Sequence, residues 1–257
     1  MKQEQVKNAL QSTKKSSFFS PFESQLLYGV CNAKINDYPY PHFYVESIFS
    51  ERSYTLLEEN WPLPQEMKSI ADSGWVTPGS FKERLYLDVS DEAMLSKVSE
   101  KRRSVWQDFA TTICSDYIIN RLVAICQPYH HLHPWLSKGG NFKVKPSILV
   151  QSDYNDYTIS PHSQHPQEIM VLLIYFAKKE NTEEAGTSMY IPRDPNFECD
   201  GLKHYKPESF HKILTAPFRR NSLFGFLKTR NSFHGVEPVD QPTERNVLYI
   251  GIVLEPN

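Results

Sequence analysis

The second half of the sequence, from about residue 141 onward, constrains the fold more than any other feature. Short stretches rich in β-branched and aromatic residues follow one another there, separated by clusters of Gly, Pro, Asn and Asp. We expect eight strands, near residues 142–151, 157–164, 169–177, 187–191, 212–216, 222–227, 232–236 and 246–254. Eight short strands at this spacing are typical of a β-sandwich or barrel.

The first half has the spacing of helices. Ser50 can cap a helix whose apolar residues include Tyr54 and Leu57, and a second helix is expected over residues 91–98. Over residues 104–125, apolar side chains recur at i, i+4 and i+8, which is typical of an amphipathic helix packed on a larger element. The sequence therefore predicts an α+β fold in which helices lie on one face of a sandwich or barrel.

Length and composition set the expected organisation. The 257 residues are enough for one large domain or two small ones, and the 40% of hydrophobic residues can fill a sizeable core. We expect a flexible N-terminal tail over residues 1–20 and a single domain over residues 21–257. Within that domain, residues 21–140 are expected to be the helical part and residues 141–257 the β core.

Charge, hydropathy and cysteine spacing disfavour several partners. The formal net charge of −2 shows no excess of positive charge, so we expect no nucleic-acid partner. The longest apolar run, residues 169–177, is shorter than the roughly 18 residues of a membrane span, so no membrane association is expected. The four cysteines have no CxxC spacing, which favours a reducing compartment, and we expect a cytoplasmic protein.

Histidines on two predicted strands form a candidate metal site. His162 and Gln164 point to the same side of their strand because strand side chains alternate, and His234 would supply a third ligand from a later strand. Two imidazoles and one oxygen ligand on one face are the set that non-haem Fe(II) oxygenases use, with the remaining positions open to a bidentate cosubstrate and O₂. The alternative for each histidine is a hydrogen-bonded structural role.

Arg245 lies at the start of the last predicted strand, 11 residues after His234. Alternation places Arg245 and Tyr249 on one face of that strand, which can be the face of the histidines. An always-charged guanidinium in an apolar interior needs an anionic partner. The far carboxylate of a 2-oxo acid that chelates the metal would provide that partner.

Two tyrosines are further candidates for binding the same carboxylate. Tyr157 and Tyr175 lie on the predicted strands and are each expected to contribute a hydroxyl group. The alternative for Arg245 is a surface position, where it would pair with Glu244 or Glu237.

Taken in order, these motifs resemble the prolyl-4-hydroxylase-like branch of the 2-oxoglutarate/Fe(II)-dependent oxygenases. The stretches that carry the resemblance are YTISPHSQHPQEIMVLLIYF, AGTSMYIP, NSLFGFLKTRNSFHGVEPV and ERNVLYIGIVLE, preceded by YPHFYVESIFSERSYTLLEENWP. The resemblance implies a double-stranded β-helix, that is, a jelly-roll, cupin-like barrel, buttressed by the N-terminal helices. It also implies that His162 and His234 bind iron and that Arg245 binds the C5 carboxylate of 2-oxoglutarate. No catalytic residue is implied beyond the metal ligands.

Gln164 departs from the pattern of this family, which has aspartate or sometimes glutamate at that position. Glutamine is neutral and one methylene longer than aspartate, so we expect weaker Fe(II) binding and retain Gln164 as a weak ligand or as the relic of a silent site. Its length fills the space that a halide occupies in the halogenating relatives, which disfavours halogenation. Asp153 and Asp156 lie upstream without the family's spacing, although a loop carboxylate could reach the metal.

The resemblance implies a 2-oxoglutarate-dependent dioxygenase that hydroxylates an unactivated C–H bond of a small-molecule or peptidyl substrate. Fe(II), 2-oxoglutarate and O₂ would be required, and ascorbate is a further cofactor to consider. Two alternatives remain open: a catalytically silent β-helix that binds a small acid or a protein, and a cupin-like enzyme that uses another metal without 2-oxoglutarate. The substrate lid is expected from residues 129–141, 178–186 and 192–210.

Overall fold

A computed structural model describes residues 20–76, 80–154, 157–178, 182–199, 201, 203–239 and 244–256. The expected tail over residues 1–20 therefore lies, apart from Ser20, outside the described residues, as does Asp156. The expected lid segments 178–186 and 192–210 are described in part.

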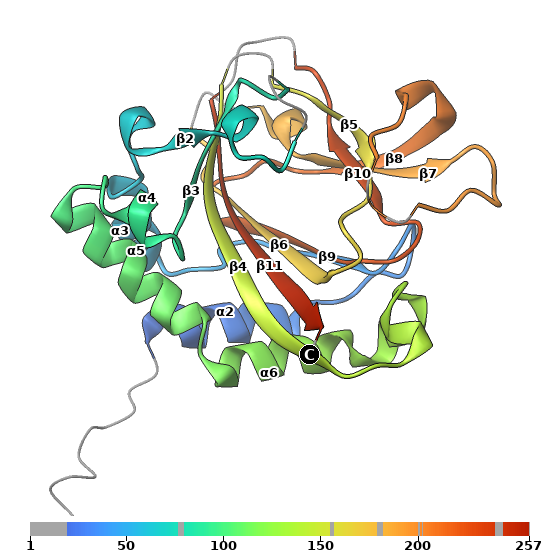
Figure 1. The fold of residues 1–257 in the computed structure, drawn as a ribbon, viewed down its shortest axis with the longest axis horizontal. Helices are drawn as coiled ribbons and strands as arrows, with labels where there is room; N and C mark the ends of the chain where they lie inside the picture. Colours follow the sequence, from blue (N-terminus) through green and yellow to red (C-terminus); the bar gives the residue numbers. More distant parts are fainter. Residues whose placement is uncertain are drawn as a thin grey trace, which may run out of the picture.

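Two antiparallel sheets form the centre of the protein (Figure 1). Within the described residues, the larger sheet has seven strands in the order β1-β9-β6-β11-β4-β3-β2, and the smaller has four in the order β5-β10-β7-β8. The strands are β1 His42–Val45, β2 Lys68–Ser69, β3 Arg84–Asp88, β4 Phe142–Asp153, β5 Ile159–His162, β6 Glu168–Tyr175, β7 Thr187–Pro192, β8 Phe210–Ala216, β9 Ser222–Leu227, β10 Phe233–Val236 and β11 Arg245–Pro256.

The order in which the chain visits the two sheets defines the fold. Strands β4, β6, β9 and β11 belong to the larger sheet, whereas β5, β7, β8 and β10 belong to the smaller one. A chain that passes back and forth between two facing antiparallel sheets in this way forms a jelly roll, here a double-stranded β-helix. The fold class and all eight strands expected from the sequence are confirmed.

Helices cover the outer face of the larger sheet, some beneath it and some to its left in Figure 1. They are α2 Pro21–Asn32, α3 Glu51–Glu59, α4 Glu92–Leu95, α5 Glu100–Ile113 and α6 Asp116–Cys126. Short 3₁₀ turns occupy Pro64–Glu66, Ile70–Asp72, Gln127–Leu132, Leu136–Lys138, Glu183–Ala185 and Pro207–Ser209. Among the described residues, no single helix is long and apolar enough to span a bilayer. The segments 100–113 and 116–132 reach that length and hydropathy only together, with a bend of 54° between them.

Two expectations about the helical half were wrong. The helix expected over residues 104–125 is two helices, because the Ser115 hydroxyl accepts a hydrogen bond from the Ile118 amide and so caps a new helix. The part expected to be helical, residues 21–140, also contains β1, β2 and β3, which extend the larger sheet at its two edges. These strands have two to five residues each, too few for a clear period-two pattern.

The larger sheet is buried on both faces. One face packs against the helices through side chains that include Ile148, Leu172 and Ile250. The other face looks toward the smaller sheet and carries Val171 and Phe224. A strand buried on both faces has no polar side to alternate with, which explains why β6 reads as an almost continuous apolar run. The space between the two sheets is the place where polar side chains from several strands can meet.

Trp106 on α5 is expected to be a major contributor to the stability of the helical layer. Its side chain is fully buried, its indole Nε1 donates a hydrogen bond to the Asn60 carbonyl oxygen at 2.8 Å, and its ring packs edge-on against Trp61. Trp106→Ala should lower the free energy of unfolding by about 3–5 kcal/mol, measured by denaturant titration. The control Tyr28→Ala, at a side chain 76% exposed, should change it by less than about 0.5 kcal/mol. Equal effects of the two substitutions would contradict this account of the core.

Candidate functional site

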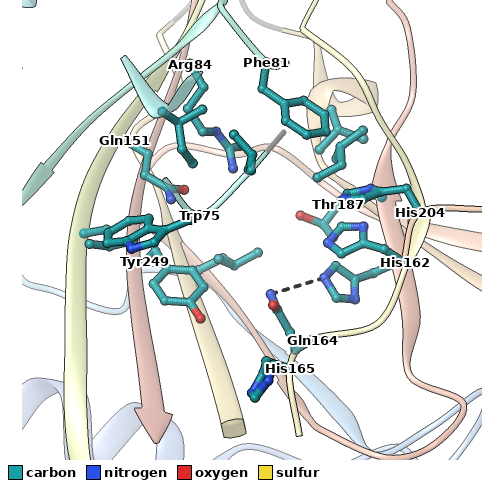
Figure 2. A pocket seen from close by; sticks show the side chains of 18 of the residues that line it. Trp75, Phe81, Arg84, Gln151, His162, Gln164, His165, Thr187, His204 and Tyr249 are labelled. Carbon is teal, nitrogen blue, oxygen red and sulfur yellow. Dashed lines mark hydrogen bonds between the residues drawn. The ribbon is translucent and has the colours of Figure 1, made fainter. Parts of the chain in front are cut away.

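A cavity of about 630 Å³ lies between the two sheets. Side chains from β4, β5, β6, β10 and β11 form its walls, and residues of the segments 70–84 and 201–204 line it as well. Its volume falls in the range of small-molecule sites in proteins. Figure 2 shows polar side chains that point into it from several walls.

His162 and His234 meet in this cavity. They are directly opposite each other on the paired strands β5 and β10, and their ring centroids are 4.3 Å apart. The Nδ1 atom of His162 lies 3.0 Å from the Ser160 carbonyl oxygen, and that of His234 lies 3.1 Å from the Ser232 carbonyl oxygen. Because a carbonyl can only accept, each Nδ1 carries the proton and each Nε2 keeps its lone pair, as in metal-binding histidines.

Burial keeps both imidazoles in the form that binds metals. Burial and the neighbouring imidazoles lower the pKa of His162 well below its usual value. Burial lowers the pKa of His234 to about 4. Both rings are therefore neutral near pH 7, and a neutral imidazole is the form that ligates a divalent metal ion.

Gln164 completes a set of three donors. Its amide nitrogen is 3.4 Å from His234 Nε2, the contact drawn as a dashed line in Figure 2. Rotating the amide by half a turn exchanges its nitrogen and oxygen, so Gln164 can present an acceptor oxygen at the same place. Among the described residues, no group of three or more His, Cys, Asp or Glu side chains is arranged to hold a metal ion. Two imidazoles and one amide oxygen are thus the available donors, and all three are neutral.

His204 is a neighbour of this set that the sequence analysis missed. Its ring stacks on that of His162, with centroids 4.7 Å apart and an interplanar angle of 30°. A single backbone bridge joins the same two residues. Its other ring neighbour is Phe81, 5.4 Å away. His204 comes from the long connection between β7 and β8, where no spacing pattern relates it to His162.

Arg245 lies in a row of three charged side chains at one end of the cavity. We call these three residues, Arg84, Asp153 and Arg245, the arginine rung. The three residues occupy matching positions on the neighbouring strands β3, β4 and β11. Arg84 makes a two-pronged contact with the Asp153 carboxylate, at 2.6 and 2.8 Å, and Arg245 Nη1 donates to it at 2.8 Å. The side chain of Asp153 is 0% exposed and that of Arg245 is 5% exposed.

The arginine rung changes the expectations for Arg245 and Asp153. Arg245 is buried rather than on the surface, and Glu244 and Glu237 form ion pairs with lysines instead. Asp153 is engaged with two guanidinium groups, and among the described residues it is not grouped with His162 and His234, which we call the histidine cluster. Arg245 shares the cavity with the histidines, as alternation along its strand predicted, but it already has one internal carboxylate as a partner.

Tyr157 and Tyr175 both lie beside the arginine rung, in different roles. The ring of Tyr157 lines the cavity and carries the Arg84 guanidinium on its face, 4.3 Å from the centroid. The Tyr175 hydroxyl donates to Thr187 Oγ1 at 2.8 Å, and that oxygen also accepts from Arg245 Nη2 at 3.3 Å. Tyr175 thus holds Thr187 and Arg245 in place, and of these two hydroxyl residues it is Thr187, not Tyr175, that lines the cavity.

Glu168 on β6 and Tyr249 on β11 also line the cavity. The Tyr249 hydroxyl donates a hydrogen bond to the Glu168 carboxylate. Burial raises the pKa of Glu168 to about 7, against smaller opposite effects of the Tyr249 hydroxyl and the Lys228 ammonium group. Nearby, the buried Lys228 donates a hydrogen bond to Ser163 Oγ at 2.6 Å. Glu168 could not be singled out from the sequence because it reads as the polar first residue of an apolar strand.

Among the described residues, only one of the three expected lid segments contributes residues that line the cavity. Residues 192–210 contribute Gly201, Lys203 and His204. The described residues of 129–141 and 178–186 contribute no lining side chain. A segment that was not expected, residues 70–84, contributes Ile70, Trp75, Val76, Phe81 and Arg84.

Comparison with known proteins adds similarities of shape. No protein-family model matches the chain, and no curated protein matches its sequence. A prolyl hydroxylase from Trichoplax adhaerens, in complex with a hypoxia inducible factor peptide, has a TM-score of 0.49 at 12% identity over 94% of each chain. Prolyl 4-hydroxylase from Phytophthora capsici has a TM-score of 0.48 at 14% identity, covering 93% of this chain and 67% of that one.

A third similar structure is HygX from Streptomyces hygroscopicus, described with nickel and 2-oxoglutarate bound. Its TM-score is 0.46 at 12% identity, covering 91% of this chain and 87% of that one. Because these TM-scores are below 0.5 and the identities are low, the fold assignment rests on the strand order given above, and the function is argued from the site residues.

Glu168 is expected to make stability depend on pH. Burial penalises its charged form, so the native state holds the proton more tightly than the unfolded chain, and stability should fall as pH rises from about 4.5 to about 7. Glu168→Gln stays neutral, so above this range it should be more stable than the parent by about 2 kcal/mol, a value reduced for partial exposure. Denaturant titrations across the pH range measure the difference, with the exposed Glu184→Gln as control. Parallel curves for parent and Glu168→Gln would contradict the burial argument.

Proposed function

We propose that this protein is a 2-oxoglutarate-dependent non-haem Fe(II) oxygenase that hydroxylates an unactivated C–H bond of a small-molecule or peptidyl substrate. The observation that carries the proposal is the convergence of His162 and His234, both neutral and both held through Nδ1, on a cavity that also contains the arginine rung. Imidazole nitrogen suits ferrous iron, and a buried cationic cluster suits the carboxylate of an acidic cosubstrate.

The chemistry of the donors fits the proposed metal. His162 and His234 would hold the ion through Nε2, and their Nδ1 hydrogen bonds fix the orientation of the rings before the metal binds. Gln164 would add its amide oxygen, a weaker ligand than a carboxylate. When bound, iron together with 2-oxoglutarate and O₂ supplies the oxidising power for C–H hydroxylation, which no side chain of the protein can provide.

The protein's own contribution is orientation and exclusion of water. The arginine rung would anchor the distal carboxylate of 2-oxoglutarate, and Thr187 would keep Arg245 in the required position. Figure 2 shows Arg84 and His162 reaching into the cavity from different walls, which suits a ligand with an acidic group at each end. The apolar walls, with Leu149 and Val247, would keep the reacting groups away from bulk water.

The neutral donor set has a thermodynamic consequence. With Gln164 in place of a carboxylate, a bound Fe(II) keeps its full charge, and the arginine rung adds a further positive charge. A dianionic 2-oxo acid can offset both, one end at the metal and the other at the arginine rung. Metal and 2-oxo acid should therefore bind with strong mutual dependence, and each should raise the affinity of the other by the same factor.

A second candidate function is a catalytically silent β-helix that binds a small acid without iron. The observation that favours it is the absence, among the described residues, of any carboxylate in the histidine cluster. The arginine rung does not depend on metal and would serve such a protein equally well. The experiments below separate the two functions.

Loss of either histidine should weaken metal binding strongly. Fe(II), 2-oxoglutarate and O₂ are expected to give succinate and CO₂ with the parent protein, and His162→Ala and His234→Ala should each weaken metal binding by more than about tenfold, because each removes one of two strong donors. Anaerobic metal titration and succinate release measure the two effects. The control His131→Ala, at an exposed ring bonded only to the Pro128 carbonyl, should change neither. Retained metal binding in both cavity variants would rule out this metal site.

Gln164→Asp should strengthen metal binding because it restores one negative charge to the donor set. We expect Fe(II) affinity without 2-oxoglutarate to rise about tenfold or more, and the dependence of metal affinity on 2-oxoglutarate to weaken. Gln167→Asp is the matched control, since Gln167 lines the same cavity at a position outside the donor set. An unchanged metal affinity in Gln164→Asp would show that residue 164 is not a ligand position.

A further inference from the structure

Within the described part of the chain, the hydrogen bonds of the arginine rung leave one guanidinium nitrogen without a partner. Each guanidinium nitrogen of Arg245 has one protein partner, at the Ala185 carbonyl oxygen, Asp153 Oδ2 and Thr187 Oγ1, so only the second hydrogens of Nη1 and Nη2 are left for a ligand. Arg84 uses Nε and Nη2 on the Asp153 carboxylate. Among the described residues, Arg84 Nη1 has no partner, although Arg84 lines the cavity.

The charges of the arginine rung are also unbalanced. Among the residues that the structure describes, two guanidinium groups share one carboxylate, which leaves one positive charge in a cluster whose side chains are 0% (Asp153), 5% (Arg245) and 13% (Arg84) exposed. An unpaired charge in such surroundings is costly. One external carboxylate would bring the cluster to two cations and two anions.

The geometry of Arg84 determines where that external carboxylate fits. The two-pronged contact with Asp153 fixes the guanidinium plane, and the ring of Tyr157 supports one of its faces. Rotation of the group is therefore restricted, and Nη1 is the corner left to the cavity. Figure 2 shows the Arg84 side chain directed into this space. A pre-oriented donor loses little entropy on binding a ligand.

We infer that Arg84 is a ligand-binding residue, which together with Arg245 holds the distal carboxylate of a dicarboxylic 2-oxo acid. Asp153 is then the internal counterion that orients both guanidinium groups and limits the site to one external carboxylate. The identity of the ligand as a 2-oxo acid rests on the proposed function, whereas anion binding by the arginine rung does not require iron. The pocket would accept 2-oxoglutarate and reject a 2-oxo acid that lacks the second carboxylate.

Charge variants of the arginine rung test this inference in metal-free protein. In EDTA, 2-oxoglutarate should raise the thermal unfolding midpoint of the parent, and 2-oxobutyrate, which lacks the distal carboxylate, should not. Arg84→Gln leaves Arg245 and Asp153 as a neutral pair, so the dissociation constant for 2-oxoglutarate should rise about tenfold or more, measured by calorimetry. The control Arg52→Gln, at an exposed position on α3, should leave it unchanged.

A double variant separates binding by charge from a folding defect. Arg84→Gln with Asp153→Asn restores one net positive charge, so affinity for 2-oxoglutarate should recover to within a few-fold of the parent. Asp153→Asn alone leaves two unpaired guanidinium groups and should lower stability in a way that 2-oxoglutarate partly reverses. The inference is overturned if Arg84→Gln binds 2-oxoglutarate within about twofold of the parent, if both acids bind the parent equally, or if neither acid binds it.

The inference and the proposed function fail in different ways. If Fe(II)-dependent succinate release occurs and Arg84→Gln keeps the parent's KM for 2-oxoglutarate, the oxygenase function stands and the role of Arg84 is refuted. If succinate is never released but 2-oxoglutarate binds in EDTA in an Arg84-dependent way, the oxygenase function fails and the role of Arg84 stands.

Discussion

The pairing of β5 with β10 is the interaction on which the candidate site depends. It sets His162 opposite His234 across two hydrogen-bonded strands, although the residues are far apart in the sequence. The backbone carbonyls of Ser160 and Ser232 then fix both rings so that each Nε2 keeps its lone pair. Because the smaller sheet packs over the larger one, these two nitrogen atoms lie in the cavity between the sheets. Without this register, the remaining polar side chains of the cavity would have no common centre.

The distribution of charge is the second constraint, and it differs between the two ends of the cavity. The histidine cluster has no carboxylate among the described residues, and the arginine rung has one carboxylate for two guanidinium groups. Both ends therefore favour an anion, and a dicarboxylic 2-oxo acid has the chemistry to reach both. Under the proposed function, this arrangement would allow a protein with Gln164 to hold a metal ion, since the cosubstrate would supply the negative charge that the side chain does not.

Much of the β-helix and part of the candidate site could be predicted from local sequence. The eight strands of the β-helix stand out because apolar runs end at turn residues, and the histidines follow from alternation along those strands. The break at Ser115 was missed because apolar periodicity continues across it, and β3 was missed because five residues carry little signal. Arg84 and His204 were missed for a different reason. Arg84 is 69 residues from Asp153, and only the packing of strands, which no spacing rule encodes, brings such residues together.

The most direct test of the central claim is an anaerobic Fe(II) titration of the parent protein with and without 2-oxoglutarate. Our account predicts saturable binding of one metal ion per chain and an affinity at least about tenfold higher when 2-oxoglutarate is present, because the 2-oxo acid provides the missing negative charge. Metal affinity that is indifferent to 2-oxoglutarate, or no specific binding in its presence, would contradict the claim that the two imidazoles and the arginine rung form one site.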